Sequence, residues 1–251
     1  MSEKGQTRIQ KYLSEVGFCS RSQAERYIRA GRIAVNGQKA VLGDKASGKD
    51  TIALDGQKIQ VKKQPRKKVI VFNKPAGVEC TLVQNPWVKS LMNFDFGGDR
   101  VFPIGRLDID THGLLLLTND GELGNRLARS SKKHDEEYLL VAQDKVTPEM
   151  LESFRSGLEG ENSISPPYCA EQPQDNALKI ILHEGRCKYI RRLCDAAGIK
   201  ILDLQRVRVG VHELGELKAG SWRVLSENEF DALKEGKVVT PGRRRIVPSK
   251  R

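Results

Sequence analysis

The carboxylate of Asp108 stands in the part of this sequence best suited to chemistry. It follows Arg106 by two residues in the stretch Gly-Arg-Leu-Asp, which reads as a polar turn. A run of four leucines comes next, predicted as a buried strand, and an Asn-Asp-Gly turn closes it. An acid placed directly before a buried strand is held by a rigid scaffold, as catalytic groups usually are. The stretch 105–121 therefore predicts a fixed, reactive carboxylate at Asp108.

A second carboxylate in the same turn, Asp110, leaves an alternative open. Asp-x-Asp also occurs in metal-dependent phosphatases and glycosyltransferases. The phosphatase pattern requires a hydrophobic strand before the first Asp and a Thr four residues after it. Here Pro103 and Gly105 come before Asp108, and His112 takes the later position. The sequence therefore favours Asp110 as a residue that hydrogen-bonds the turn, and no metal ligand is expected.

The Asp108 stretch resembles the active-site signature of pseudouridine synthases, in the RsuA-like branch that acts on ribosomal RNA. The resemblance implies that Asp108 is the catalytic aspartate. Pseudouridine formation breaks the N-glycosidic bond of uridine, turns the detached uracil and joins its carbon 5 to the sugar. No group leaves and no redox change occurs, so no metal or other cofactor is expected. In this family the carboxylate either attacks the ribose or removes a ribose proton, and the sequence does not choose between these routes.

Four further positions match the family pattern. Arg106 resembles the residue that enters the RNA stack as the target base swings out. Tyr138 resembles the active-site tyrosine that lies against the target base, and Arg191 the basic residue that pairs with Asp108 and favours its charged form. The Lys-Pro-x-Gly turn that begins at Lys74 resembles the first family motif, so Lys74 is expected to contact RNA. Asp108, Tyr138 and Arg191 are thus the predicted catalytic residues.

The chain departs from the family pattern at two positions. Glu136 stands where a lysine commonly precedes the tyrosine by two residues, and Tyr189 stands where a glutamine often precedes an Ile-Arg pair. Glu136 reverses a charge near the site, which bears on substrate choice more than on the reaction. The resemblance otherwise extends over about residues 7–235, up to a closing segment that begins at Leu217.

The elements that must position these residues can be read from hydrophobic patterns. Strands are predicted at 69–72, 138–141, 178–182 and 201–209, and helices at 122–129, from 147 onward and at 190–197. Strands interleaved with helices and short turns, without a glycine-rich phosphate loop, predict an α+β fold. The resemblance implies a mixed, mostly antiparallel central sheet of the pseudouridine synthase type.

The N-terminal segment predicts a small separate module. Apolar residues at helical spacing form a first helix that Gly17 ends, and Ser20 with Gln23 forms the capping box of a second. Asn36-Gly37 and Asp55-Gly56 predict two hairpins. This pattern resembles the alpha-L RNA-binding module found in a small-subunit ribosomal protein and in tyrosyl-tRNA synthetases. By that resemblance its helical pair contacts structured RNA.

Positive charge is concentrated in this module and at the C-terminal end. Residues 1–68 hold 16 Lys/Arg and 6 Asp/Glu, a net +10, whereas residues 69–240 have a net charge of −4. The last eleven residues supply +5. Such a distribution indicates electrostatic capture of a polyanion by phosphate contacts that set register. The arginines expected to bind RNA in and around the second helix are Arg21, Arg26, Arg29 and Arg32.

Composition bears on where the protein is located and on the state of its cysteines. No run of 18 apolar residues exists and the N-terminus has no hydrophobic signal segment, so a cytoplasmic protein without a membrane span is expected. The five cysteines are irregularly spaced and none forms a Cys-x-x-Cys pair, which indicates reduced thiols rather than disulfides or zinc ligands. The expected segments are 1–61 for the RNA-binding module, 62–68 for a basic linker, 69–240 for the catalytic domain and 241–251 for a disordered basic tail.

These observations together predict a monomeric RNA pseudouridine synthase that isomerises one or a few uridines of ribosomal RNA. Its partner would be ribosomal RNA or an assembly intermediate of a ribosomal subunit, with no small-molecule cofactor. Two alternatives remain open: a synthase that acts on transfer RNA, and a non-catalytic RNA-binding factor in ribosome assembly that keeps the fold. The intact set of Asp108, Tyr138 and Arg191 argues against the non-catalytic factor.

Overall fold

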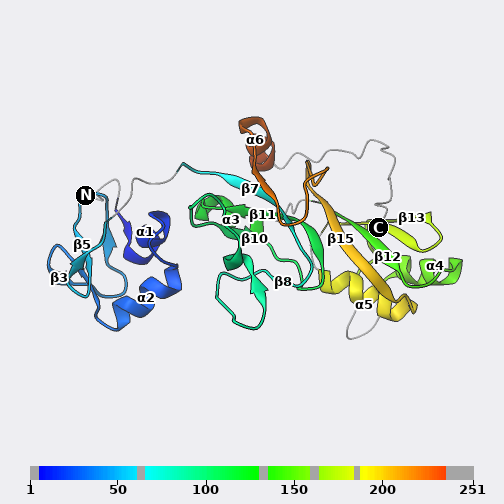
Figure 1. Cartoon of the computed structure of the whole chain (residues 1–251), viewed down its shortest axis with the longest axis horizontal. Coiled ribbons are helices and arrows are strands. Elements are labelled where there is room, and N and C mark those ends of the chain that lie inside the picture. The colour runs from blue at the N-terminus through cyan, green and yellow to red at the C-terminus, as the bar shows by residue number, and fades with distance from the viewer. Residues whose placement is uncertain (1–5, 61–65, 130–134, 159–163, 184–186, 236–251) are drawn as a thin grey trace. The chain divides into compact units, whose positions relative to one another are not determined.

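The chain forms two compact units in a computed structural model (Figure 1). The first unit holds the chain up to Lys68 together with Phe96–Phe102 and Thr118–Gly121, and the second holds the remainder. The structure describes residues 6–60, 66–129, 135–158, 164–183 and 187–235. Most of the expected linker at 62–68 and all of the expected tail at 241–251 lie outside these residues.

The first unit is built from two helices and short strands. They are β1 (Thr7–Arg8), α1 (Ile9–Glu15), α2 (Arg21–Arg29), β2 (Ile33–Val35), β3 (Gln38–Lys39), β4 (Lys45–Ala46), β5 (Ile52–Leu54) and β6 (Gln57–Lys58). Four of the strands form a sheet in the order β3-β2-β5-β6, while β1 pairs with β4. Two hairpins therefore supply the whole four-stranded sheet.

Local signals in the sequence explain these boundaries. Ser20 caps α2, because its Oγ accepts from the backbone N–H of Gln23 at 3.0 Å. The side-chain carbonyl of Gln23 accepts from Arg26. Both hairpin turns have positive φ at their two central residues, 50° and 85° at Asn36 and Gly37 and 51° and 78° at Asp55 and Gly56. Asn-Gly and Asp-Gly favour that conformation, so both predicted hairpins are confirmed.

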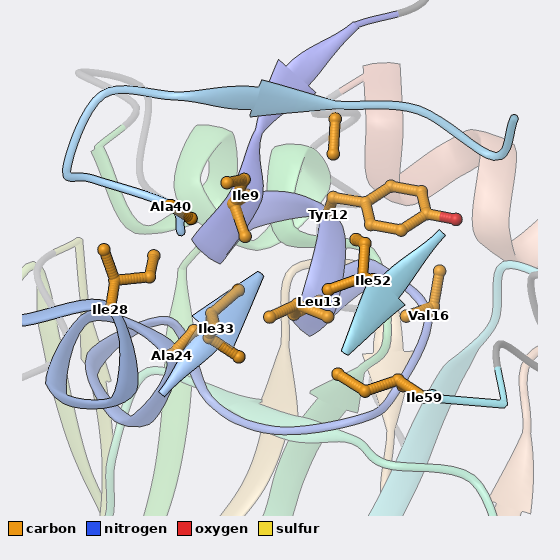
Figure 2. Close-up of a cluster of buried hydrophobic side chains, with 11 residues drawn as sticks. Ile9, Tyr12, Leu13, Val16, Ala24, Ile28, Ile33, Ala40, Ile52 and Ile59 are labelled. Carbon is orange, nitrogen blue, oxygen red and sulfur yellow. The ribbon is translucent and has the colours of Figure 1, made fainter. Parts of the chain in front are cut away.

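One apolar cluster holds the first unit together (Figure 2). Side chains from α1 and α2 point toward side chains from β2 and β5, and Ile9, Leu13 and Ala24 are fully buried. Because the helices bury only one face, the charged residues of α2 are left on the opposite side.

The second unit contains the longer elements. The strands are β7 (Val69–Lys74), β8 (Val78–Glu79), β9 (Lys89–Ser90), β10 (Phe102–Ile104), β11 (His112–Thr118), β12 (Glu136–Ala142), β13 (Cys169–Gln174), β14 (Ala177–Leu182), β15 (Ile201–Val209), β16 (His212–Glu213) and β17 (Trp222–Val224). The helices are the 3₁₀ turn η1 (Leu91–Asn93), α3 (Gly121–Arg129), α4 (Pro148–Ser156), α5 (Cys187–Ala197) and α6 (Glu227–Glu235).

A large mixed sheet organises these elements in the order β13-β14-β12-β15-β11-β7-β17. Strand β12 runs antiparallel to both of its neighbours, whereas β11 and β15 run parallel. The predicted α+β fold with a mostly antiparallel sheet is confirmed. None of the helices in the described ranges is long and apolar enough to cross a membrane.

The central strands are apolar because their side chains are buried on both faces of the sheet. All six residues of β7 are buried, as are the four consecutive leucines of β11. Leu114 and Leu116 pack with Val69, Val71 and residues from α3 and α6. Strands buried on both sides read as continuous apolar runs, which is why the leucine run was recognisable in the sequence. The segment that carries Asp108 thus leads directly into the core.

Candidate active site

Asp108 lies in the turn that joins β10 to β11. The backbone N–H of Thr111 donates to the carbonyl oxygen of Asp108 at 3.2 Å, which closes the turn. Leu107 is buried, Arg106 is exposed, and Asp108 itself is half-buried. Within the described ranges, the Asp108 carboxylate makes no hydrogen bond or ion pair. The backbone thus fixes this carboxylate while its oxygens stay available to a substrate.

Lys74 supports the Asp108 turn from inside the protein. Its ammonium group is fully buried and donates to the carbonyl oxygens of Val78 at 2.7 Å, Pro75 at 3.0 Å and Ile109 at 3.4 Å. The backbone N–H of Gly77 also donates to Ile109, at 2.7 Å. In the free protein Lys74 thus contacts the backbone, and its expected contact with RNA stays a prediction. Lys74 ends a strand that is buried throughout, so backbone carbonyls replace water around its charge.

Arg191 reaches the same turn from α5, but it pairs with a different carboxylate from the one expected. Its Nη2 lies 2.8 Å from Oδ1 of Asp110 and donates to Oγ1 of Thr111 at 3.1 Å. The predicted pairing with Asp108 is thus not found, and Asp110 forms an ion pair rather than only bonding its turn. The backbone hydrogen bond that closes the turn presents Asp110 and Thr111 to α5. Arg191 therefore fixes the turn without neutralising Asp108.

Cys80 lies against the other side of the Asp108 segment. Its Sγ accepts from the backbone N–H of Leu107 at 3.3 Å. Burial raises the pKa of the Cys80 thiol, although this hydrogen bond and the nearby charges of Lys74, Arg206 and Arg106 oppose the rise. The thiol is therefore neutral and acts here as a small packing group. Lys74, Arg206 and Arg106 thus all lie near this thiol, beside the segment that carries Asp108.

Tyr138 lies on β12, where it is fully buried. Its hydroxyl donates to Oε2 of Glu136 at 2.5 Å. Oε1 of Glu136 in turn pairs with Nη1 of Arg206 at 3.0 Å, and Nε of Arg206 donates to the carbonyl oxygen of Leu114 at 2.8 Å. The departure from the family pattern at Glu136 thus comes with a partner, because Arg206 balances the reversed charge.

Gly113 explains how the Asp108 turn and Arg206 come together. It lies on β11 opposite Arg206 of β15, and its φ is +103°. A Cβ atom there would lie 2.2 Å from the backbone oxygen of Arg206. Only glycine permits this close approach of the two strands. The segment from Asp108 to Gly113 is therefore held at one end by the turn hydrogen bond of Asp108 and at the other by the pairing of Gly113 with Arg206.

Arg206, the partner of Glu136, is a part of the site that sequence reasoning missed. A usable signal was present, because two adjacent glutamates directly precede the strand predicted at 138–141 and two arginines lie within the one predicted at 201–209. Charges inside buried strands must be paired, so Glu136-Glu137 and Arg206 with Arg208 were candidates for mutual contact. The partners are far apart in sequence, so only the register of β12 against β15 could have matched them.

The predicted RNA-binding arginines of the first unit are distributed along and just after α2. Arg26 and Arg29 are exposed, and Arg21 is half-buried. Arg32 follows the helix, and its guanidinium forms a two-point ion pair with the Asp55 carboxylate. It also lies 4.9 Å from the ring centroid of Tyr27. The four arginines are therefore not equivalent, since Arg32 already has an anionic partner.

A metal centre finds no support in the described part of the chain. It contains no group of three or more His, Cys, Asp or Glu side chains that could hold a metal ion. Asp110, the residue that left a metal site open, is paired with Arg191.

Comparison with known proteins gives this geometry a context. Residues 68–196 match the RNA pseudouridylate synthase family, and residues 7–52 match the S4 domain. The dual-specificity RNA pseudouridine synthase RluF of Escherichia coli strain K12 is 33% identical over 223 residues, which cover 89% of this chain and 77% of that protein. An uncharacterized RNA pseudouridine synthase of Aquifex aeolicus is 37% identical over 238 residues, with 91% and 94% covered.

Two further similarities agree with these. The ribosomal large subunit pseudouridine synthase B of Vibrio cholerae is 34% identical over 247 residues, which cover 94% of this chain and 75% of that protein. A crystal structure of a pseudouridylate synthase superimposes with a TM-score of 0.62 at 27% identity, covering 90% of this chain and 99% of that one. The expected family resemblance is thus confirmed over both matched segments. This chain belongs to the RNA pseudouridylate synthase family.

Proposed function

We propose that this protein isomerises one or a few uridines of ribosomal RNA to pseudouridine, with Asp108 as its catalytic carboxylate. The observation that carries the proposal is the state of Asp108: its turn is fixed from several sides, yet the carboxylate has no partner in the described ranges. Family membership supplies the reaction class. The ribosomal substrate is supported by the relative in Vibrio cholerae, which is named for the large ribosomal subunit.

Asp108 would supply the negative charge that the reaction needs, either as a nucleophile on the ribose or as a base toward a ribose proton. Both roles require a carboxylate that stays ionised and close to the target nucleotide. Fixing the turn through Lys74 and Arg191 reduces the motion lost when substrate binds.

Arg106 would act where the RNA helix is opened. It is exposed at the beginning of the Asp108 turn, and a flipped base leaves a gap in the stack that a planar guanidinium can fill. The S4 domain would hold the RNA through Arg21, Arg26 and Arg29, which contact phosphates and set register without reading much sequence.

Release of tritium from ribosomal RNA labelled at carbon 5 of uridine tests the proposal. Wild-type protein should release tritium up to the number of target uridines, and Asp108→Asn should release none while still binding the RNA. If the wild-type protein binds this RNA but releases no tritium, it is a binding factor for ribosomal RNA. Release only from labelled transfer RNA would contradict the proposed substrate while leaving the reaction intact.

A further inference from the structure

The Tyr138 hydroxyl donates a hydrogen bond to a carboxylate. Its hydrogen bond to Oε2 of Glu136 is 2.5 Å long, at the lower end of the ordinary range for an O–H donor and a charged acceptor. Both residues lie on β12, two positions apart, so their side chains emerge on the same face of the sheet. The phenolic proton therefore already points along a path toward Glu136.

Arg206 holds the Glu136 carboxylate in place. Its guanidinium is almost fully buried, and Nη1 contacts the Glu136 oxygen that Tyr138 does not use. Nε of Arg206 is anchored on the Leu114 carbonyl, which fixes the orientation of the fork. This ion pair uses Oε1 of Glu136 and leaves Oε2 directed at the tyrosine.

The proposed reaction requires an acceptor for the proton on carbon 5 of uracil. When carbon 5 of uracil has bonded to the sugar, the C5–H bond must break and a proton must be added at N1 to give pseudouridine. A neutral phenol is a weak base on its own, because its protonated form is highly acidic. It becomes an effective acceptor if its own proton leaves as the new one arrives.

We propose that Glu136 is the positioning residue and proton acceptor behind Tyr138, an inference that rests on the proposed pseudouridine synthase function. The Tyr138 oxygen takes the proton from C5 while its O–H proton moves to Oε2 of Glu136. The electrons of the C5–H bond remain in the uracil ring. The neutral Glu136 then returns its proton to solvent as N1 gains one, so no proton or electron is left over. Because Tyr138 is buried in the free protein, the target base must displace its cover to reach the ring.

The chain contains a matched control for this relay. Glu137, the next residue, pairs through Oε2 with Nε of Arg208 at 3.0 Å. The side chains of Glu136 and Glu137 are 15% and 14% exposed, so the two carboxylates are nearly equally buried. Adjacent residues of a strand face opposite sides of a sheet, so Glu137 is directed away from Tyr138. Replacing Glu137 therefore measures the effect of losing a buried ion pair without affecting the proposed proton transfer.

The experiment measures single-turnover rates on ribosomal RNA that carries either hydrogen or deuterium at carbon 5 of uridine. Glu136→Gln keeps the side-chain shape but cannot accept the proton, so we expect at least a tenfold slower rate, roughly the lower range for lost general base catalysis. We also expect the rate ratio between hydrogen and deuterium substrates to increase, because C5–H cleavage becomes limiting. Glu137→Gln should leave both the rate and the ratio close to wild type.

Two further variants separate the relay from a purely structural role. In a Tyr138→Phe background, Glu136→Gln should cause no additional loss, because Glu136 acts through the hydroxyl. Glu136→Asp keeps the charge beside Arg206 but withdraws the carboxylate by roughly one carbon–carbon bond, about 1.5 Å, so it should be folded and intermediate in rate. This variant allows the test even if Glu136→Gln does not fold.

Several outcomes would overturn the relay alone. They are a Glu136→Gln or Glu136→Asp protein with wild-type rate and isotope ratio, an equal loss for Glu136→Gln with and without the Tyr138 hydroxyl, and an isotope ratio that increases equally in Glu137→Gln. In each of these cases wild-type turnover would remain and Asp108→Asn would stay inactive, so the proposed function would stand. Absence of turnover in the wild-type protein would remove both proposals together.

Discussion

The two units of this protein use positive charge in opposite ways. In the first unit the arginines of α2 lie on the surface, where Arg26 and Arg29 are exposed. In the second unit Lys74, Arg206 and Arg208 are buried, and each donates to backbone carbonyls or to a glutamate. Burying a cation costs several kcal/mol unless hydrogen bonds and counter-charges offset it. The first arrangement suits binding of a polyanion, and the second suits holding a site in one geometry.

The largest expected effect is on the reaction rate, and it distinguishes Asp108 from Asp110. Asp108→Asn should lower the single-turnover rate by at least about 10³-fold while RNA affinity changes by less than about tenfold, or 1.4 kcal/mol. Asp110→Asn should be milder in rate, because it removes the partner of Arg191 and not the reacting group. Rates and filter-binding affinities of both variants give the comparison. A more damaging Asp110→Asn would show that the wrong carboxylate has been assigned.

The next effect tests whether buried cations hold the site. Lys74→Met fills the same space but leaves the carbonyls of Pro75, Val78 and Ile109 without their donor. We expect the free energy of unfolding to fall by roughly 2–5 kcal/mol, measured by urea denaturation. Lys145→Met is the control, since Lys145 pairs with Asp175 at 3.0 Å on the surface and should contribute far less. Equal losses for the two lysines would remove the distinction between buried and exposed cations.

Whether a feature could be predicted from the sequence depended on how far apart its residues lie along the chain. Signals within a few residues were reliable: the Ser20 cap, the two type I′ hairpin turns and the leucine run of β11 are all found. Partners across the fold were not predictable, because they depend on strand register and on the direction of each side chain. The sequence therefore did not show that Lys74 bonds to backbone carbonyls or that Arg191 pairs with Asp110, two contacts that support the Asp108 turn.

A smaller effect tests the surface charges of α2. Replacing Arg21, Arg26 and Arg29 together by Gln should weaken RNA binding by at least about tenfold and make its salt dependence less steep by up to about three counterions. The matched control replaces three exposed lysines elsewhere in the same unit, Lys45, Lys49 and Lys58, with Gln, which removes equal charge. Binding at several salt concentrations checks both. Equal slopes for the two triple variants would show that phosphate contacts are not concentrated on α2.

The smallest effect concerns Arg32, whose charge lies in the RNA-binding unit but is already paired. Because Arg32 holds Asp55 and lies on Tyr27, a phosphate would have to displace an existing carboxylate. Arg32→Ala should therefore weaken RNA binding less than Arg29→Ala does and barely change the salt dependence. Asp55→Asn should instead strengthen RNA binding, because it releases Arg32 for contact with a phosphate. A loss with Arg32→Ala that equals the loss with Arg29→Ala would show that the Asp55 pair opens when RNA binds.

The same pair predicts a small dependence of stability on pH. The hydrogen bond from Arg32 lowers the pKa of the Asp55 carboxyl below its ordinary value. A carboxyl whose pKa is lower in the folded protein contributes stability above its unfolded pKa, near 4, and loses that contribution as pH falls through the folded value. The melting temperatures of wild type and Arg32→Ala should therefore differ most at neutral pH and converge as pH falls below about 4. Both side chains are about half exposed, so salt can screen their attraction. The difference in melting temperature should therefore be smaller in 150 mM salt than in low salt. A difference that persists at pH 3 would mean that Arg32 stabilises the unit through Tyr27 and not through Asp55.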